Sequence, residues 1–499
     1  MRKQIKKAVG IIIAAMIVIS SCLAASAYTA PVQDGVESIL ADGYSTDPNR
    51  YEIYPLPQSV VYDNEETPTS FEITKEVNVV YDNDTDAATK AFLNEVLDKY
   101  GITATEGTQT VSDKTNILVG VKDSGGAADT YVKENITIKN ETLFDNYNPY
   151  VLSAKEGTIA ILGGDTDSAY YGIATLQMMF SSFAGEKFLT AQIEDYANVL
   201  YRGFIEGMYA IWNDEGRESL MRFARDYKMN TYIYASKSDP YHTSLCYELY
   251  PEDQINAIAE LAKIGEETKC YYAWSAHIAG FFSGLNVNDT EAYEARYAKL
   301  LAKFQQLYDA GVRRFAILND DFPAGQVSDV VTLINRLMDE FIKPNGCEMI
   351  AYCPNGYNKA WLGGSNELDI LSGLDDSIML FWTGDNVNSP MTQETIDYAQ
   401  TKFDGDICFW LNYPVNEHGK SGMFLGDITH YARDNVKMKG AVSNPCLYPE
   451  ASKVALYQLA ALWWNNTNYS EHAEEIWLSS FKYLQPEVYS AFTLSLIHI

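Results

Sequence analysis

The stretch Arg313-Arg314-Phe315-Ala316-Ile317-Leu318-Asn319-Asp320-Asp321-Phe322 decides the fold. Its centre, from Phe315 to Leu318, is a short apolar strand that runs straight into two adjacent carboxylates. A strand that is apolar on both faces suits a parallel sheet, and parallel sheets bind ligands at the carboxyl ends of their strands. Two carboxyls side by side at such an end resist ionising together, so we expect their pKa values to separate into those of an acid and a base. Asp also caps loops and helices, and the stretch by itself leaves that role open.

Strands and helices alternate from residue 199 onwards. We predict eight strands, at Leu200–Glu206, Asn230–Ala235, Tyr271–Ser275, Phe315–Leu318, Glu348–Cys353, Ile378–Trp382, Ile407–Leu411 and Gly440–Ser443. Helical patterns between them cover Gly216–Tyr227, Glu252–Gly265, Ala292–Ala310, Val327–Ile342 and Gln393–Phe403, with a further helix expected near Asp427–Val436. Eight strand–helix units over about 250 residues are what a (β/α)8 TIM barrel requires, and the active site of such a barrel lies at the carboxyl ends of its strands.

The predicted barrel, residues 197–449 of an α/β protein, is flanked by two smaller regions. Residues 51–196 form a small α+β domain in which we predict strands at Phe71–Thr74, Val77–Tyr81 and Asn116–Val121, a hairpin of Tyr150–Ala154 with Thr158–Leu162, and helices at Asp86–Tyr100 and Ser168–Phe180. Residues 28–50 are polar and aperiodic, which is typical of a linker. Residues 450–499 begin a helical domain, with helices at Ala451–Trp464 and Ser470–Tyr483, and we expect that domain to be truncated because residues 494–499 break the pattern.

The first 27 residues predict export. A basic segment precedes the apolar run Ala8 to Ile19, and Ala25-Ser26-Ala27 follows, so residues 1–27 have the pattern of a signal peptide and the protein is expected to be secreted. Ile19-Ser20-Ser21-Cys22 also matches a lipobox, which leaves a lipid anchor at Cys22 as an alternative. No other stretch is long and apolar enough for a membrane span. The 499 residues carry a formal net charge of -30, which argues against nucleic acid as a partner.

The carboxyl ends of the predicted strands carry chemistry suited to sugars. They present an acidic pair, aromatic rings, amides and hydroxyls: Glu206-Gly207, Lys237, His277, Asp320-Asp321, Tyr357, Thr383, Trp410, Asn412 and Asn444. Aromatic faces stack on sugar rings, amides and carboxylates bind hydroxyls, and glycoside hydrolysis uses carboxyl groups. The sequence has no metal-ligand spacing, phosphate loop or Ser-His arrangement, so we expect no metal and no cofactor.

Six motifs at successive strand ends resemble those of glycoside hydrolase family 84, the β-N-acetylglucosaminidases that include bacterial O-GlcNAc hydrolases and hyaluronidase-like enzymes. In chain order they are Arg202-Gly203-Phe204-Ile205-Glu206-Gly207, Tyr234-Ala235-Ser236-Lys237-Ser238-Asp239-Pro240-Tyr241-His242, Cys353-Pro354-Asn355-Gly356-Tyr357, Trp382-Thr383-Gly384, Trp410-Leu411-Asn412-Tyr413-Pro414-Val415 and Ser443-Asn444-Pro445. The resemblance covers residues 50 to 480.

The resemblance implies substrate-assisted retaining hydrolysis of terminal β-linked N-acetylglucosamine on a glycan or glycoprotein. The 2-acetamido oxygen of the substrate attacks the anomeric carbon and forms an oxazoline, so no carboxylate nucleophile is needed. By matching, Asp320 holds the acetamido N–H and Asp321 is the general acid and base. The implied substrate-binding residues are Gly207 and Lys237 for outer hydroxyls, Tyr357 and Asn412 for the acetamido group, Thr383 and Trp410 as pocket walls, and Asn444 for a hydroxyl. Trp410 could instead be barrel packing and Lys237 a solvated loop charge. His277 and His242 match no family role, so we treat them as structural.

Four positions depart from the family pattern. Met208 and Ala210 stand where the family has Phe and Gly, Thr243 replaces an Arg, and Glu417 replaces the Asp that binds sugar hydroxyls. Glu417 has one more methylene, so either its reach or the preferred terminal sugar changes. Two other functions stay open: a two-carboxylate glycosidase acting on sugars without an N-acetyl group, and a surface glycan-binding protein with a degenerate barrel.

Overall fold

The computed structural model describes residues 45–321, 325–417 and 422–484. The predicted signal peptide, Cys22, most of the linker and residues 485–499 lie outside these ranges. Within them, no helix combines the length and the apolar character that crossing a membrane requires.

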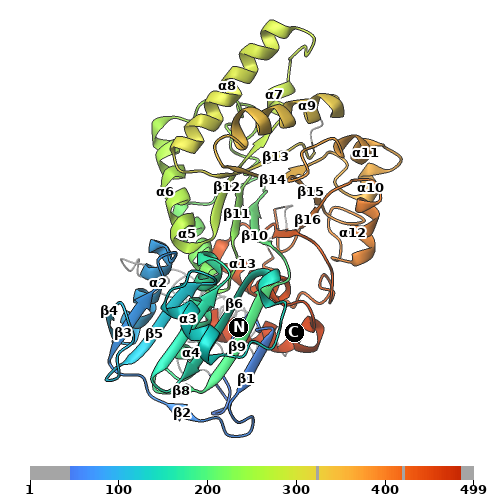
Figure 1. The fold of residues 1–499 in the computed structure, drawn as a ribbon. Coiled ribbons are helices and arrows are strands. Elements are labelled where there is room, and N and C mark those ends of the chain that lie inside the picture. The colour runs from blue at the N-terminus through green and yellow to red at the C-terminus, as the bar shows by residue number, and fades with distance from the viewer. Residues whose placement is uncertain (1–44, 322–324, 418–421, 485–499) are drawn as a thin grey trace, which may run out of the picture. The chain divides into compact units, whose positions relative to one another are not determined.

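A closed barrel of eight parallel strands forms the centre of the described chain (Figure 1). Each strand pairs with the next in sequence, and the last pairs with the first. The strands are β10 (Tyr201–Glu206), β11 (Thr231–Tyr234), β12 (Tyr271–His277), β13 (Arg314–Leu318), β14 (Glu348–Cys353), β15 (Met379–Trp382), β16 (Ile407–Leu411) and β17 (Gly440–Ser443). The predicted barrel is therefore confirmed, and the bounds of β14, β16 and β17 are as predicted.

Alternate residues of each strand point into the barrel and out to its helices. On β13, Ala316 and Leu318 belong to the interior cluster, whereas Phe315 and Ile317 pack against the surrounding helices. Successive side chains of a strand point to opposite faces, so the other strands follow the same period of two, except where a register shift on β14 places both Ile350 and Ala351 in the interior cluster. The interior cluster comprises chiefly Ile205, Ile233, Ala235, Ala273, Ala351, Cys353, Met379, Phe381, Cys408, Trp410 and Val442.

Helices connect most of the strands. They are α5 (Asp214–Asp226), α6 (Glu252–Thr268), α7 (Ala279–Phe282), α8 (Thr290–Asp309), α9 (Val327–Leu337) continued by a π-helical turn at Met338–Ile342, α10 (Lys359–Leu362), α11 (Glu367–Leu371) and α12 (Gln393–Gln400). Helix α5 begins at the cap Asn213, whose side chain accepts the Gly216 N–H. Its apolar face, including Leu220 and Phe223, is buried.

The predicted helix near Asp427–Val436 is wrong. In the described residues between β16 and β17, which are 412–417 and 422–439, the chain forms turns and extended segments. The Asp427 carboxylate accepts the Thr429 N–H at 3.0 Å, and the Ile428 N–H donates to the Gln458 side chain at 3.2 Å. Asn435 adopts a left-handed φ of 59°. A local bond from Asp427 and a bond to the distant Gln458 therefore hold this segment in place of the expected helix.

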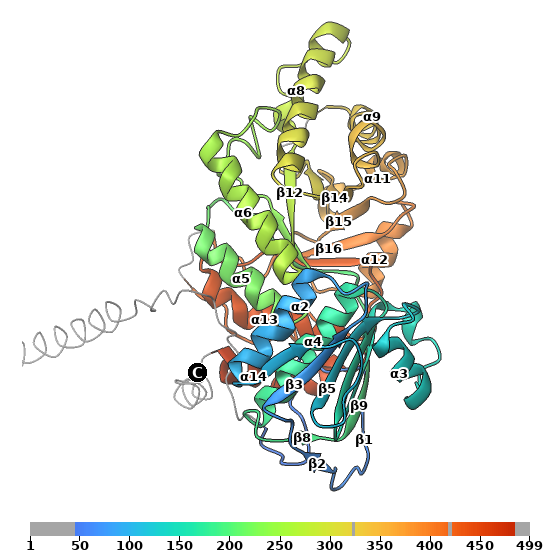
Figure 2. The ribbon, with the colours of Figure 1, turned by 60° about the vertical axis from the view of Figure 1, so that its left-hand side comes forward.

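Residues 45–197 contain a seven-stranded mixed sheet with helices on both faces. Its order is β1 (Ser59–Tyr62), β9 (Ala191–Ala197), β6 (Tyr147–Lys155), β7 (Thr158–Gly163), β5 (Thr115–Val121), β3 (Glu76–Tyr81) and β4 (Thr103–Glu106), and β2 (Ser70–Phe71) pairs separately with β8 (Phe188–Leu189). Helices α2 (Ala87–Lys99) and α4 (Thr166–Ser182) cover one face and α3 (Ala127–Asn135) the other (Figure 2). The predicted hairpin is confirmed, whereas β1, β4, β9 and α3 were not predicted.

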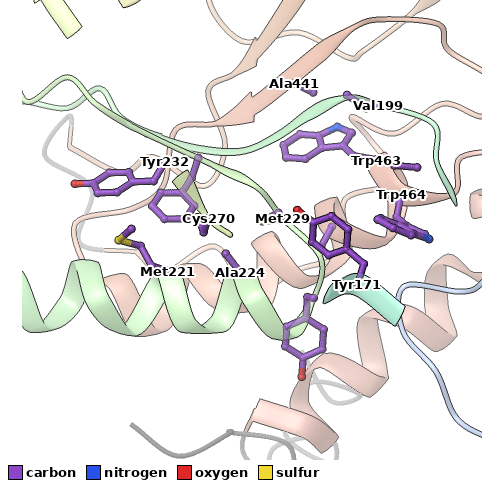
Figure 3. Packing of buried hydrophobic residues seen from close by; sticks show 14 of the residues in the cluster. Tyr171, Val199, Met221, Ala224, Met229, Tyr232, Cys270, Ala441, Trp463 and Trp464 are labelled. Carbon is purple, nitrogen blue, oxygen red and sulfur yellow. The ribbon is translucent and has the colours of Figure 1, made fainter. Parts of the chain in front are cut away.

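Two helices follow the barrel, α13 (Pro449–Trp464) and α14 (Tyr469–Leu484). Trp463 and Trp464 end α13 and are fully buried, beside Val199 and Tyr171 (Figure 3). The Val199 N–H donates to the Trp463 carbonyl at 3.1 Å, and the rings of Trp464 and Tyr171 lie 5.6 Å apart. This packing fixes the segment that enters β10.

Candidate active site

Six of the ten predicted site residues continue the inward alternation of the barrel strands beyond their last paired residues. Each lies two residues after an interior residue: Gly207 after Ile205, Lys237 after Ala235, Asp320 after Leu318, Thr383 after Phe381, Asn412 after Trp410, and Asn444 after Val442. Because the barrel is closed and parallel, all these positions meet at one end.

A pocket of about 500 Å³ lies at that end of the barrel. Nine of the ten predicted site residues line it: Gly207, Asp320, Asp321, Tyr357, Thr383, Trp410, Asn412, Glu417 and Asn444. Further lining residues are Tyr209, Cys353, Trp361, Val387, Asn388 and Val415. A larger hollow of about 730 Å³ is lined by residues 45–65 and the last two helices, but by none of the strand-end residues.

Asp320 is a buried carboxylate paired with a buried cation. The Lys237 Nζ lies 2.8 Å from Asp320 Oδ1 and 2.7 Å from Oδ2, and only 4% of the Lys237 side chain is exposed. Burial alone would raise the pKa of Asp320, but the charge and hydrogen bond of Lys237 outweigh it and hold that pKa below its ordinary value. Asp320 is therefore ionised at neutral pH. Lys237 lies behind Asp320 and is not a solvated loop charge.

His277 supports the same residue from β12. Its Nε2 lies 2.9 Å from the Asp320 carbonyl oxygen and 3.5 Å from Oδ1. Burial, followed by the charge of Lys237, lowers the pKa of His277, so the ring is neutral and the carbonyl fixes Nε2 as the protonated nitrogen. We treated His277 as structural, yet it touches the acidic pair. The inward alternation of Ala273, Ser275 and His277 was the signal that pointed to it.

Asp321 leaves the strand geometry. Its φ of 61° is left-handed, which costs a non-glycine residue about 1 kcal/mol. A continued strand would point Asp320 and Asp321 to opposite faces, whereas both line the pocket. The turn at Asp321 therefore brings the second carboxyl to the substrate side.

Two phenols face the Asp321 carboxylate. The Tyr357 hydroxyl donates to Oδ1 at 3.2 Å, and the Tyr209 hydroxyl lies 3.5 Å from Oδ2. Burial and then the charge of Asp321 raise the pKa of Tyr357, so it stays a protonated donor. Asp320 has a lysine and Asp321 has phenols, so the environments of the two carboxyls differ as an acid–base pair requires.

The opposite wall presents polar atoms that still need partners. The Asn444 Nδ2 donates to Asn412 Oδ1 at 3.0 Å, and the Asn412 Nδ2 donates to the Val387 carbonyl at 2.7 Å. Asn444 Oδ1 and Trp410 Nε1 are buried and have no hydrogen-bond partner in the described part of the chain. Buried polar atoms are rarely left unpaired, so an acceptor and a donor are available here to a ligand. Trp410 thus lines the pocket as well as packing in the barrel.

Close packing explains the glycine at the end of β10. A Cβ added to Gly207 would lie 2.5 Å from the Trp410 ring. Two residues later, the Tyr209 N–H donates to Glu417 Oε2 at 2.5 Å, and this bond ties the loops after β10 and β16 together. Whether Glu417 also binds a sugar hydroxyl stays a prediction. Among the described residues, no group of three or more His, Cys, Asp and Glu side chains could hold a metal ion.

Comparisons with known proteins agree with this geometry. A family model described as beta-N-acetylglucosaminidase matches residues 202–496, and one described as glycosyl hydrolase family 20, domain 2, matches residues 50–196. The protein O-GlcNAcase of Rattus norvegicus is 24% identical over 285 residues, which are 53% of this chain and 30% of that protein. The chain thus spans less than a third of the length of the curated relatives that it matches.

Solved structures extend the similarity to the whole described fold. CpGH84D is 36% identical with a TM-score of 0.83, and the match covers 89% of this chain and 74% of that one. CpGH84B is 27% identical with a TM-score of 0.78, covering 89% and 76%. The chain therefore belongs to glycoside hydrolase family 84, the family of the β-N-acetylglucosaminidases.

Proposed function

We propose that this protein removes terminal β-linked N-acetylglucosamine from glycoconjugates by substrate-assisted retaining hydrolysis. The observation that carries the proposal is the contrast between its two adjacent carboxyls. Asp320 is buried and ionised against Lys237, whereas Asp321 is exposed to the pocket and contacted by Tyr357. One is suited to bind a donor N–H and the other to exchange a proton.

Asp320 is poorly placed to be a nucleophile. Lys237 contacts both of its oxygens, and an attack by either oxygen on a sugar would break that pairing inside the protein. As an ionised acceptor it can instead bind the substrate's acetamido N–H, which directs the acetamido oxygen at the anomeric carbon. This supports the substrate's own nucleophile over the two-carboxylate alternative.

Asp321 then moves the proton. It protonates the leaving oxygen while the anomeric bond breaks, and its carboxylate later takes a proton from the water that opens the oxazoline. Tyr357 stays protonated beside it and can donate to the intermediate. Asn444 Oδ1 and Trp410 Nε1 supply an acceptor and a donor for the sugar. A glycan is thus the partner that fits the pocket.

A panel of aryl β-glycosides of GlcNAc, GalNAc, Glc and Gal tests the function. We expect GlcNAc to be cleaved best and a GlcNAc-derived thiazoline to inhibit. Asp321→Asn should lower kcat by about 10²–10⁴-fold on a poorly activated leaving group. The loss should be smaller on a strongly activated one, which needs no proton. Full activity of this variant would refute the role of Asp321.

The same panel separates the alternatives. Glucoside cleavage at a rate comparable with that of GlcNAc would favour two-carboxylate chemistry. Binding without turnover of any glycoside would favour a glycan-binding protein. A GalNAc preference would assign Glu417 to the terminal sugar.

We also propose that the protein is exported, on the strength of the pattern in residues 1–27. N-terminal sequencing of the mature protein from culture medium and membranes tests this. A start at Tyr28 supports free secretion, and a lipidated Cys22 supports a surface anchor. An uncleaved Met1 inside cells would contradict both.

A further inference from the structure

The loop that carries Tyr357 is fixed by a carboxylate outside the pocket. After β14 ends at Cys353, the segment 354–358 leaves the barrel sheet. The Glu367 side chain, from the first residue of α11, reaches back to this loop. Its Oε1 accepts the Asn355 N–H at 3.0 Å and its Oε2 accepts the Gly356 N–H at 2.9 Å. Each oxygen therefore fixes one of two consecutive backbone groups directly before Tyr357.

This carboxylate is buried without a cation. Glu367 is 8% exposed, and it forms no ion pair with any residue in the described ranges. A Cβ added to Gly356 would lie 2.8 Å from Glu367 Oε2, so a side chain there would push into the carboxylate. Burial raises the pKa of Glu367, and the two backbone N–H groups oppose that rise. A carboxylate buried without a cation is expensive even with two backbone donors, so this position favours a side chain that offers two acceptor oxygens.

Two walls of the pocket depend on the fixed loop. The Tyr357 hydroxyl donates to Asp321 Oδ1, and the Tyr357 carbonyl accepts the Thr383 N–H at 2.9 Å. A shift of the loop would therefore move both the phenol on Asp321 and the Thr383 wall. Misplacing a reacting geometry by about 1 Å can cost about 100-fold in rate.

We propose that Glu367 is a positioning residue for the reaction, which holds the Tyr357 loop so that the phenol stays on Asp321. The inference rests on the proposed function. The carboxylate is needed because it offers one oxygen to each N–H. A glutamine keeps the length but turns an NH₂ group toward one of the two donors, which leaves that donor unpaired.

A matched control exists in the N-terminal sheet. Glu194 of β9 is 4% exposed, and its two oxygens accept the consecutive N–H groups of Lys139 at 2.7 Å and Asn140 at 2.8 Å. Like Glu367 it binds two consecutive backbone N–H groups, with a further bond from the Gln192 side chain at 2.8 Å, and the loop that it holds does not line the pocket. Substituting it should disturb folding in the same way without touching the reaction.

The experiment compares Glu367→Gln, Glu194→Gln, Tyr357→Phe and the double variant Glu367→Gln with Tyr357→Phe, measuring kcat and KM on an aryl GlcNAc glycoside and thermal unfolding. We expect Glu367→Gln to lower kcat by about 10- to 100-fold with a smaller change in KM. Glu194→Gln should keep the wild-type kcat while losing about as much thermal stability as Glu367→Gln. In the Tyr357→Phe background, Glu367→Gln should lower kcat by a smaller factor than it does alone, because the phenol it positions is gone and only its effect on the Thr383 wall remains.

Two results would overturn the proposal. One is a kcat of Glu367→Gln that matches that of Glu194→Gln. The other is a double variant whose loss is the product of the single losses. If Glu367→Gln does not fold, Gly356→Ala replaces it, since the added methyl displaces the same carboxylate and should lower kcat likewise. A wild-type protein that neither cleaves the glycoside nor binds the thiazoline would refute the proposed function, and the role of Glu367 with it. Wild-type activity that Glu367→Gln retains refutes only the role of Glu367.

Discussion

Two buried lysine–aspartate pairs occupy opposite ends of β11 and have different surroundings. Lys228 precedes the strand and bonds Asp195 at 3.0 Å, with both side chains fully buried. Lys237 follows the strand and bonds Asp320, which lines the pocket. The Asp195 carboxylate also accepts hydrogen bonds from Tyr150, from the Trp464 indole and from two backbone N–H groups. A fully buried pair whose carboxylate already has all its hydrogen-bond partners can only stabilise the fold. A pair whose carboxylate lines a pocket can also contact a substrate.

The contrast has a physical basis in desolvation. A buried ion pair gains little net stability, but removing one partner leaves an uncompensated charge. At Asp195 there is no space for water to replace a lost partner. At Asp320 the pocket admits water or substrate, so removing one partner of the pair should cost less unfolding free energy. The two pairs should therefore separate stability from activity.

The largest effect is expected for Asp195→Asn. It leaves Lys228 buried without an anion, so we expect unfolding in urea to show a loss of about 3–5 kcal/mol. The kcat of the protein that remains folded should stay close to wild type. A loss below about 1 kcal/mol would mean that this pair behaves like an exposed one and would break the comparison.

Asp320→Asn should give the opposite result. In the proposed reaction a neutral amide would lack the charge that polarises the acetamido N–H, so we expect kcat to fall by about 10²–10³-fold, equivalent to about 3–4 kcal/mol. The loss of unfolding free energy should be smaller than that of Asp195→Asn, because Asp320 lines a pocket that admits water beside the pair. Equal losses of stability in the two variants would show that water in the pocket does not reduce the cost of the unpaired lysine.

His277→Ala tests how far the geometry of Asp320 depends on its carbonyl bond. Removing the imidazole frees the Asp320 carbonyl, and we expect kcat to fall about 10-fold with little change in KM. His242→Ala is the matched control, since that buried imidazole bonds Ser275 and not the acidic pair. Equal kcat losses in both variants would return His277 to a structural role.

The smallest effect is a pH dependence of stability. The pKa of Asp320 in the fold lies below its ordinary value, so the ionised group stabilises the fold above the unfolded pKa of about 3.9. That contribution is lost as the pH falls through the folded pKa. We expect the unfolding free energy of the wild type to drop more steeply below about pH 4 than that of Asp320→Asn. Parallel curves would contradict the assignment of the charge.

The sequence alone was sufficient for the barrel and for most of the pocket. Eight apolar strands alternating with amphipathic helices predict a parallel barrel, and the period of two along each strand decides which side chains reach its open end. Asp320, Asn412 and Asn444 follow from that rule, and so does His277, to which we assigned only a structural role. The failed helix near Asp427–Val436 shows the limit of periodicity, because local side-chain bonds there compete with the helix.

Only the tertiary structure decided which side chains from different loops contact one another at the carboxyl end of the barrel. Lys237 on Asp320, the left-handed turn at Asp321 and Glu367 on the Tyr357 loop join residues that lie far apart in the chain or depart from its regular geometry. A hydrophobic pattern is periodic and local, so the strands and helices that it specifies can be predicted from the sequence. The partner of a buried charge depends on which loops meet once the barrel has closed, because only burial makes that partner necessary.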